Sequence, residues 1–281
     1  MHSDTLQASS RSRPSQAAAA VRKCGGRSSS ARRLLVASLP ALLLAAPVAA
    51  AAAESAAKGL AAPPVIYDAA SHKSIWVDSR SLFDSHGRID RTVVSDHDAV
   101  AIDSILAIKA SPDGCIHLGP PMAIESFAPT ERATLADAVK GADLVLQGRV
   151  VATAAGFSFA TPGQLITILP ERVFRNVAAA RARYLLFVPA GTVRAGNKTI
   201  CSEAPGYDPL PKAGEEVLVL LPHMWLTDLE VLRCPGPNAL ISLPPGALIQ
   251  LARKYPDEAG PALDAGALLR RVAALASGIE P

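Results

Sequence analysis

Carboxylate and imidazole side chains gather in one polar stretch of the chain, between residues 84 and 98. The side chains that could bind a metal there are Asp84, His86, Asp90, Asp96, His97 and Asp98. Neutral imidazoles and carboxylates are ligands for divalent metals, and a bound metal can activate water for hydrolysis. The spacing matches no established metal motif, and aspartate also forms solvated turns. We favour a polar loop, and the alternative is a metal-assisted hydrolase with His86, Asp96, His97 and Asp98 as candidate ligands.

Ser95 stands beside Asp96 and His97, so the three residue types of a catalytic triad occur in a row. Triad members normally meet in space from separate elements, and the sequence contains no G-x-S-x-G nucleophile elbow. Neither a dinucleotide-binding nor a phosphate-binding glycine motif occurs either. The sequence therefore predicts no catalytic residue and no cofactor.

Cysteine offers a second kind of chemistry. Cys24 lies in the export signal described below, which leaves Cys115, Cys201 and Cys234. In an oxidising compartment two of the three are expected to form a disulfide. We favour Cys201–Cys234, which would close a loop of about 33 residues and contribute about 3 to 4 kcal/mol. A bridge from Cys115 to Cys201 or to Cys234, tying an earlier region to the rest, remains the competing arrangement.

The first 53 residues have the pattern of an export signal. Five basic residues between positions 22 and 33 precede an apolar Leu, Ala and Val run at 34–53, and Ala51 and Ala53 fit the small positions before a cleavage site. A run of this length also fits a membrane anchor, but Pro40 and Pro47 interrupt it. We expect an exported protein, periplasmic or extracellular, with an uncleaved anchor as the alternative.

Removal of this segment changes the charge balance of the chain. It contains seven of the 28 Lys and Arg residues and one of the 25 acids, so 21 basic and 24 acidic groups remain, a formal charge of −3. A basic stripe interleaved with aromatic residues, typical of nucleic-acid binding, is not found. We therefore exclude nucleic acid as the expected partner and expect an unidentified protein or small molecule.

The remaining chain divides by composition into four regions. Residues 54–64 are an Ala-rich flexible leader, 65–129 a β-rich extension, 130–243 a helix followed by a barrel, and 244–281 a helical end. Apolar groups of strand length are bounded by Gly, Pro or Asn at 142–151, 163–176, 182–193, 214–222, 228–233 and 238–243. Such spacing predicts a mainly β fold, a small antiparallel β-barrel.

Helices are expected at three places. Thr130 begins a helix that Gly141 ends, and Asp264 caps a helix with Leu268, Val272 and Leu275 on one face. A further helix is expected over ALIQLARKY, after Pro244-Pro245-Gly246. The stretch AVAIDSILAIKA, 99–110, fits a helix as well as a strand.

Several motifs in the barrel segment resemble a family of secreted bacterial proteins of unknown function. The shared pieces are Ala142-Asp143-Leu144-Val145 with Gly148 and Val150, Glu171-Arg172-Val173-Phe174-Arg175-Asn176, Val188-Pro189-Ala190-Gly191, Pro205-Gly206-Tyr207, and Gly214-Glu215-Glu216-Val217-Leu218-Val219-Leu220-Leu221. The resemblance implies a barrel similar to the oligonucleotide/oligosaccharide-binding type or to netrin and metalloprotease-inhibitor modules. It implies no catalytic residues. The zinc-chelating N-terminal Cys of those inhibitors has no counterpart near Glu54.

These observations favour a non-catalytic binding or interaction protein. Loops on a rigid scaffold are the usual place for binding residues. We expect the site in the segments 154–163 and 194–214, which flank barrel strands. A secreted protease inhibitor and the metal-assisted hydrolase are the alternatives.

Overall fold

The structure is a computed structural model that describes residues 61–68, 72–119, 134–177, 180–202, 209–222, 230–258 and 260–278. All of these belong to one compact unit, Pro47–Pro281. The export signal, and the leader up to residue 60, lie outside the described residues. In the part of the chain described, no helix is long and apolar enough to cross a membrane.

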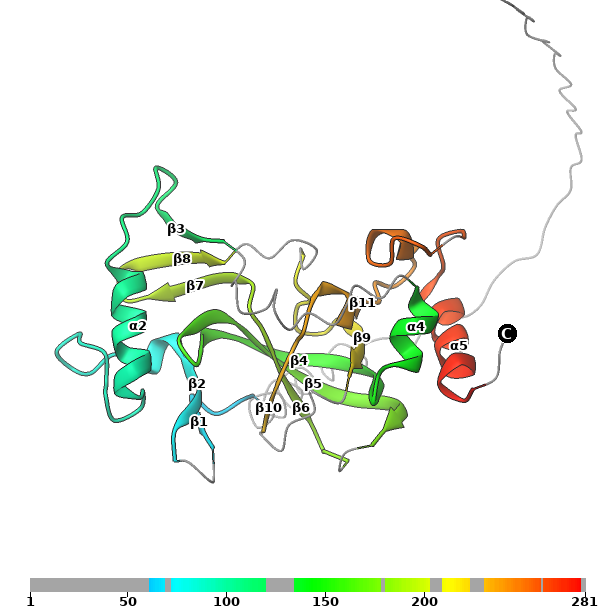
Figure 1. The fold of residues 1–281 in the computed structure, drawn as a ribbon, viewed down its shortest axis with the longest axis horizontal. Coiled ribbons are helices and arrows are strands. Elements are labelled where there is room, and N and C mark those ends of the chain that lie inside the picture. Colours follow the sequence, from blue (N-terminus) through cyan, green and yellow to red (C-terminus); the bar gives the residue numbers. More distant parts are fainter. Residues whose placement is uncertain are drawn as a thin grey trace, which may run out of the picture. The chain divides into compact units, whose positions relative to one another are not determined.

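Strands dominate the described residues (Figure 1). They are β1 (Val65–Tyr67), β2 (Ser74–Asp78), β3 (Cys115–Leu118), β4 (Leu144–Ser158), β5 (Thr161–Asn176), β6 (Tyr184–Val188), β7 (Gly191–Ala195), β8 (Lys198–Ser202), β9 (Glu216–Leu221), β10 (Val231–Arg233) and β11 (Leu240–Ser242). The helices are α2 (Asp96–Leu106), α4 (Leu135–Lys140) and α5 (Ala265–Ala276), with short 3-10 turns η1 (Ser79–Ser81), η3 (Pro237–Ala239) and η4 (Leu251–Arg253).

The long hairpin of β4 and β5 is the centre of the main sheet. It pairs from Leu144↔Asn176 to Ser158↔Thr161, and β4 is long enough to have different neighbours at its two ends. Its first half pairs with β9, which carries β11, and its last residues pair with β2, which carries β1. On the other side β5 pairs with β6, and β10 joins β6 in parallel. The register between β4 and β5 shifts between Gln147 and Gly148.

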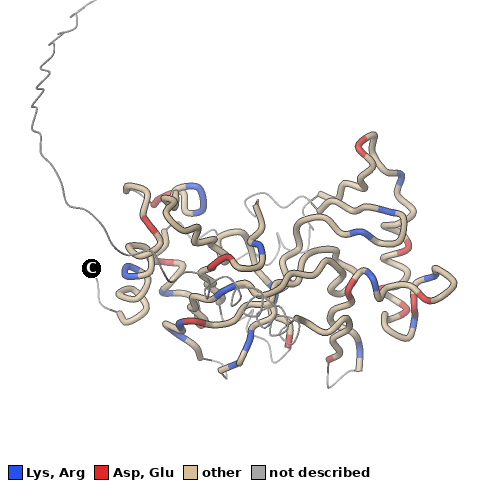
Figure 2. Tube along the Cα trace, turned by 180° about the vertical axis from the view of Figure 1, so that it is seen from behind, with Lys and Arg blue, Asp and Glu red and all other residues tan. Residues whose placement is uncertain are grey.

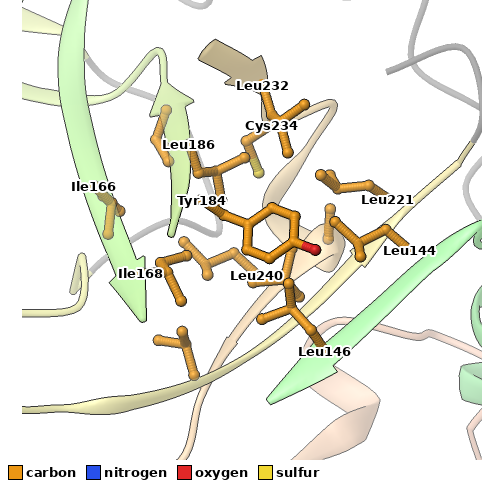
Figure 3. Packing of buried hydrophobic residues seen from close by; sticks show 14 of the residues in the cluster. Leu144, Leu146, Ile166, Ile168, Tyr184, Leu186, Leu221, Leu232, Cys234 and Leu240 are labelled. Atoms are coloured by element: carbon orange, nitrogen blue, oxygen red, sulfur yellow. The ribbon is translucent and has the colours of Figure 1, made fainter. Parts of the chain in front are cut away.

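Both faces of this sheet are buried at its centre, which explains why its central strands read as continuous apolar runs. Alternate residues of β4, β6 and β9 meet in one cluster that includes Leu144, Leu146, Tyr184, Leu186 and Leu221 (Figure 3). The intervening residues Val145, Leu218 and Leu220 face a second cluster beneath α4 and α5. Burying both faces lets a chain with few aromatic residues form a large core.

The predicted closed barrel is not found, although the mainly β fold is confirmed. A barrel would need its outermost strands to pair, and the sheet ends instead at β10 on one side and at β1 and β11 on the other. The strands β10 and β11 are consecutive along the chain. Between them run residues 234–239, which contain Pro235 and Pro237 and form η3. Proline cannot donate a backbone hydrogen bond to a neighbouring strand, so this connection is poorly suited to close the sheet.

A second, three-stranded sheet stands beside the first, with the order β3-β8-β7. Together with α2 it encloses a separate apolar cluster that contains Ile102, Ile116, Val193 and Ile200. The undecided stretch within 99–110 is helical, because Ser95 caps α2 by accepting a hydrogen bond from the Asp98 amide. β3 lies in the region 65–129 that was expected to be β-rich, but neither β3 nor β8 was predicted as an individual strand. Both are short: β3 buries Cys115 and Ile116 in succession, and β8 buries Ile200 and Ser202.

The helices α4 and α5 together cover one face of the main sheet. Asp264 caps α5 and its Leu268, Val272 and Leu275 are buried, as predicted. Arg175 donates from β5 to carbonyls at the ends of both helices, including those of Val139 and Ala276. The expectation of a helix over ALIQLARKY is wrong, because only the short 3-10 turn η4 forms there. The helix expected from Thr130 begins instead after Thr134, and residues 120–133 lie outside the described residues.

One buried carboxylate gives the fold a testable pH dependence. Asp78 ends β2, and burial works to raise its pKa, but hydrogen bonds from the Arg80 guanidinium and amide outweigh that effect, so the pKa lies below its ordinary value of 3.8. A carboxyl group whose pKa is lowered by folding stabilises the protein at pH values above its ordinary pKa. This stabilisation is lost as the pH falls through the folded-state pKa.

We therefore expect the urea midpoint of the wild type to fall more steeply than that of Asp78→Asn between about pH 5 and pH 3. Asp103→Asn, at an exposed position on α2, is the matched control and should follow the wild type. Parallel curves for the wild type and Asp78→Asn would contradict the assignment.

Candidate functional site

The carboxylates of the 84–98 stretch form local hydrogen bonds and ion pairs. Asp84 accepts hydrogen bonds from the amides of His86 and Arg88, and Asp90 accepts them from Thr92. Asp96 pairs with Arg91 at 2.8 Å. Within the described residues no group of three or more His, Cys, Asp and Glu side chains could hold a metal ion. His86 and His97 are exposed and are not brought together with the aspartates as a site.

Ser95 and Asp98 form a helix cap rather than a catalytic pair. The Ser95 hydroxyl donates to the Asp98 carboxylate at 2.7 Å and accepts from the Asp98 amide at 3.1 Å. This reciprocal arrangement satisfies the N-terminus of α2. Both side chains are thus explained by local folding.

The favoured disulfide pairing is wrong. Cys115 on β3 is bonded to Cys201 on β8, and Cys234 is a buried thiol that donates to the Gly236 carbonyl. The strands β3 and β8 run parallel, and His117, two residues after Cys115, is opposite Cys201. The Cα atoms of Cys115 and Cys201 are therefore only 5.9 Å apart. Cys234 follows β10 on the main sheet and packs in the cluster of Figure 3. The bridge found is one of the competing arrangements.

The first of the two expected binding loops is mostly strand, and the second is strand only in part. Residues 154–163 hold the end of β4, a two-residue turn and the start of β5, while 194–214 hold the β7–β8 hairpin and residues 203–208, which are not described. The first segment nevertheless contains the most unusual backbone in the described chain. Phe159 and Ala160 form its turn with φ values of 46° and 61°.

A two-residue hairpin turn with positive φ at both positions normally uses Asn or Gly, because a side chain strains the left-handed conformation. Phe159 is 44% exposed, so burying its ring does not explain the strain. Strained turns of this kind persist where their surroundings hold them and are frequent at binding sites. The tip of the β4–β5 hairpin is therefore a candidate site.

Arg233, the last residue of β10, holds the turn in place. Its guanidinium lies 5.0 Å from the Phe159 ring centroid and 6.0 Å from that of Phe187, and its Nη2 donates to the Ser158 carbonyl at 3.3 Å. Burial lowers the pKa of Arg233, yet an arginine remains charged at any physiological pH. Among the described residues no carboxylate forms an ion pair with it. A half-buried cation thus lies close to two aromatic rings and has no opposing charge among the described residues.

Two glycines form the floor on which the aromatic rings pack. Gly156 and Gly163 face each other across the hairpin. A Cβ on Gly156 would come within 2.8 Å of the Trp76 ring, and one on Gly163 within 2.8 Å of the Phe187 ring. The two rings in turn contact each other with centroids 6.0 Å apart. The missing side chains let Trp76 and Phe187 lie directly against the backbone.

Three buried polar atoms of this cluster lack a hydrogen-bond partner among the described residues. They are Trp76 Nε1, Ser158 Oγ and Arg233 Nε, and Trp76 and Ser158 are each 1% exposed. The strand register places the three residues on one face of the sheet. Val77 pairs with Phe157, so their neighbours Trp76 and Ser158 face the opposite way, and Arg233 is opposite Phe187 in the parallel pair. We call Trp76, Ser158, Phe159, Phe187 and Arg233 the hairpin-tip site. In Figure 1 its strands, β2, β4, β5, β6 and β10, are adjacent.

Comparison of the chain with family models, curated proteins and solved structures gives no match. The resemblance to secreted bacterial proteins therefore stays a prediction.

A sequence signal for the site existed in the hairpin itself. Gly156 and Gly163 are placed symmetrically about Phe159-Ala160 in the run GFSFATPG, which is typical of a hairpin that approaches other side chains closely. The position of Arg233 depends on the parallel pairing of β10 with β6, which no local pattern indicates.

Proposed function

We propose that this chain is an exported, non-catalytic binding protein whose ligand presents an anionic hydrogen-bond acceptor to the hairpin-tip site. The observation that supports it is Arg233, a half-buried cation stacked on two aromatic rings with no acidic partner among the described residues. Moving a charged group from water into the protein interior costs free energy unless a partner of opposite sign is present. An anionic ligand would supply that partner.

The chemistry of the site favours binding over catalysis. Arginine pairs with carboxylate and phosphate through its planar fork but does not exchange protons at neutral pH. No imidazole or carboxylate is among the residues of the hairpin-tip site. The aspartates that a metal-assisted hydrolase would need form local hydrogen bonds and ion pairs instead. No observation favours a protease inhibitor, so we do not propose one.

Export is part of the proposal. The Cys115–Cys201 disulfide is compatible with an oxidising compartment outside the cytosol. Residues 1–53 would be removed as a signal peptide, and the mature chain would begin at Glu54. We also propose that the curved main sheet is an incomplete relative of the small oligonucleotide/oligosaccharide-binding barrels, with β10 and β11 as the two strands that do not meet.

The proposal predicts that protein isolated from its exported fraction retains an anion that depends on Arg233. Native mass spectrometry should show the anion on the wild type and on Arg183→Gln, and at least tenfold less on Arg233→Gln, because a hydrogen bond to a charged group contributes about 1.5 to 3 kcal/mol. Arg183 is the matched control, a half-buried arginine with its own partner, Glu230. The intact mass of the same samples gives the first residue of the mature chain.

Equal occupancy of the wild type and Arg233→Gln would contradict the proposed site. The absence of a bound anion from all three samples would also contradict it.

A further inference from the structure

A histidine–aspartate pair lies beside the disulfide of the smaller sheet. His117 Nε2 and Asp113 Oδ2 are 2.7 Å apart, and Asp113 Oδ1 accepts a hydrogen bond from the Cys115 amide. Asp113 precedes Cys115 by two residues and His117 follows it by two, so the contact between them spans Cys115. Alternate side chains of a strand share a face, so the imidazole and the Cys115 side chain lie on one side of β3.

The second half-cystine lies on the same face of this sheet. Cys201 on β8 is opposite His117 in the parallel pair with β3, and the two strands lie side by side in Figure 1. Ile116 and Ile200, also opposite each other, point to the other face and are buried in the cluster that contains Ile102 of α2. The sulfur bridge and the imidazole therefore share the face that is turned away from this cluster.

The two half-cystines differ in exposure. Cys115 is 4% exposed, whereas Cys201 is half-buried. A thiolate that attacks one sulfur of a disulfide displaces the other, and a leaving sulfur of lower pKa departs faster. Attack from solvent therefore favours Cys201, with Cys115 as the leaving sulfur. An imidazolium beside a thiol lowers the pKa of that thiol, so His117 lies where it can assist this departure.

From this arrangement we propose that the Cys115–Cys201 bond is a thiol–disulfide exchange site for low-molecular-weight thiols. Cys201 forms the mixed disulfide with the incoming thiol, and Cys115 is the leaving sulfur. His117 stabilises the Cys115 thiolate, and Asp113 is a positioning residue that orients the imidazole. The exchange site shares no residue with the hairpin-tip site and does not depend on an anion bound there.

The exchange consumes two thiols and proceeds in two steps. The first thiol loses its proton to water, and its thiolate attacks the Cys201 sulfur. A new S–S bond forms there while the Cys115–Cys201 bond breaks, and Cys115 leaves with the electron pair. A second thiolate then attacks the sulfur that the first thiol contributed, which releases Cys201 as a thiolate. Two thiols are thus oxidised to one small disulfide, the protein disulfide is reduced to a dithiol, and the reverse sequence closes the bridge.

The charges on this face favour a protonated imidazole beside the bridge. The pKa of Asp113 lies below its ordinary value of 3.8, first because of the hydrogen bond from the Cys115 amide and then because of that with His117, so this carboxyl is ionised at neutral pH. The one other charged side chain that the three strands place on this face is Arg194, opposite Thr199, which is opposite Cys115. An ionised carboxylate in contact with an imidazole favours the imidazolium.

The attacked sulfur can be identified by trapping the intermediate. The wild type would be partly reduced with glutathione, alkylated rapidly and mapped by mass spectrometry. We expect glutathione on Cys201 and the alkyl group on Cys115 in the intermediate. Glutathione found chiefly on Cys115 would overturn the assigned roles.

His117→Gln tests the imidazole, because glutamine keeps a polar side chain but carries no charge. We expect glutathione to open the bridge about tenfold more slowly near pH 7, the change expected when the pKa of a leaving thiol rises by about two. The ratio of the wild-type rate to the variant rate should shrink as the pH rises and the imidazole loses its proton, which a structural role would not produce. His86→Gln, at an exposed histidine, is the control and should open at the wild-type rate. Equal rates for the wild type and His117→Gln at every pH would overturn the role of His117.

Opening through global unfolding is the competing route to reduction. In native buffer we expect the opening rate to increase in proportion to the glutathione concentration and to exceed the rate of global unfolding measured in urea and extrapolated to water. A rate that levels off at the unfolding rate would overturn the exchange site. Arg233→Gln should open at the wild-type rate, so failure of the exchange site and failure of the proposed anion site are separate outcomes.

Discussion

Loss of the Cys115–Cys201 bridge is expected to lower the free energy of unfolding by about 4 to 5 kcal/mol. The two residues are 86 positions apart, and closing a loop of that length restricts the unfolded chain strongly in the chain-entropy model. The bond also joins two parallel strands of the smaller sheet, which shares its apolar cluster with α2 and with Val77 and Phe157 of the main sheet. We therefore expect the double variant Cys115→Ser/Cys201→Ser to unfold at a much lower urea concentration, with β3, β7, β8 and α2 losing amide protection first.

Cys234→Ser is the control for this result. Its thiol donates to the Gly236 carbonyl, and a hydroxyl can do the same, so we expect a loss of about 1 to 2 kcal/mol. Peptide mapping without reductant should recover the peptides of Cys115 and Cys201 joined. A joined pair that contains Cys234, or equal stability losses for the two variants, would contradict the pairing.

Substitution of Gly156 or Gly163 by alanine is expected to destabilise the protein by about 3 kcal/mol or more. A Cβ on Gly156 would overlap the Val77 carbonyl and the Trp76 ring, and one on Gly163 would overlap the Val188 carbonyl and the Phe187 ring. Backbone oxygens of paired strands cannot move aside without breaking the sheet, so the overlap is not easily relieved. Both changes should also displace the rings that flank Arg233 and weaken ligand binding.

Gly236→Ala is the matched control for the glycine pair. A Cβ there meets nothing within 4 Å, and its φ of 179° is ordinary extended backbone. Its urea midpoint should remain close to that of the wild type, whereas Gly156→Ala and Gly163→Ala should show earlier unfolding and a changed Trp76 environment. If either hairpin variant were as stable as Gly236→Ala, the packing of the rings on the glycine floor would be wrong.

Local patterns predicted a large share of the fold. The apolar runs of β4, β5, β6 and β9 and the capped helix after Asp264 follow from alternation, turn residues and helical spacing. Closure of the sheet could not be predicted in this way, because it depends on whether β10 reaches β11 across residues 234–239. The disulfide failed for the same reason, since the parallel alignment of β3 with β8 joins segments far apart in the sequence.

The candidate site shows a similar division. The segment 154–163 was selected from the sequence as a binding loop, and it contains Ser158 and Phe159, but as a hairpin turn rather than a loop. Arg233 carries no local signal, because its role comes from lying opposite Phe187 in a parallel pair. The aspartates and histidines of 84–98 are candidate metal ligands on the basis of residue type alone, and in the structure their hydrogen bonds are local. Charged residues of both signs also alternate along the described chain, without a continuous basic stripe (Figure 2).

The account centres on Arg233 as an anion-binding group, and its Nε–H can be observed directly. In a proton–nitrogen correlation spectrum of protein labelled with ¹⁵N-arginine, the Arg233 Nε–H signal is assigned by its loss in Arg233→Gln. We expect this signal to shift saturably on addition of an anion, with benzoate and inorganic phosphate as the probes, while the Arg183 signal stays in place. An Arg233 signal unmoved by every anion, including phosphate, would contradict the central claim.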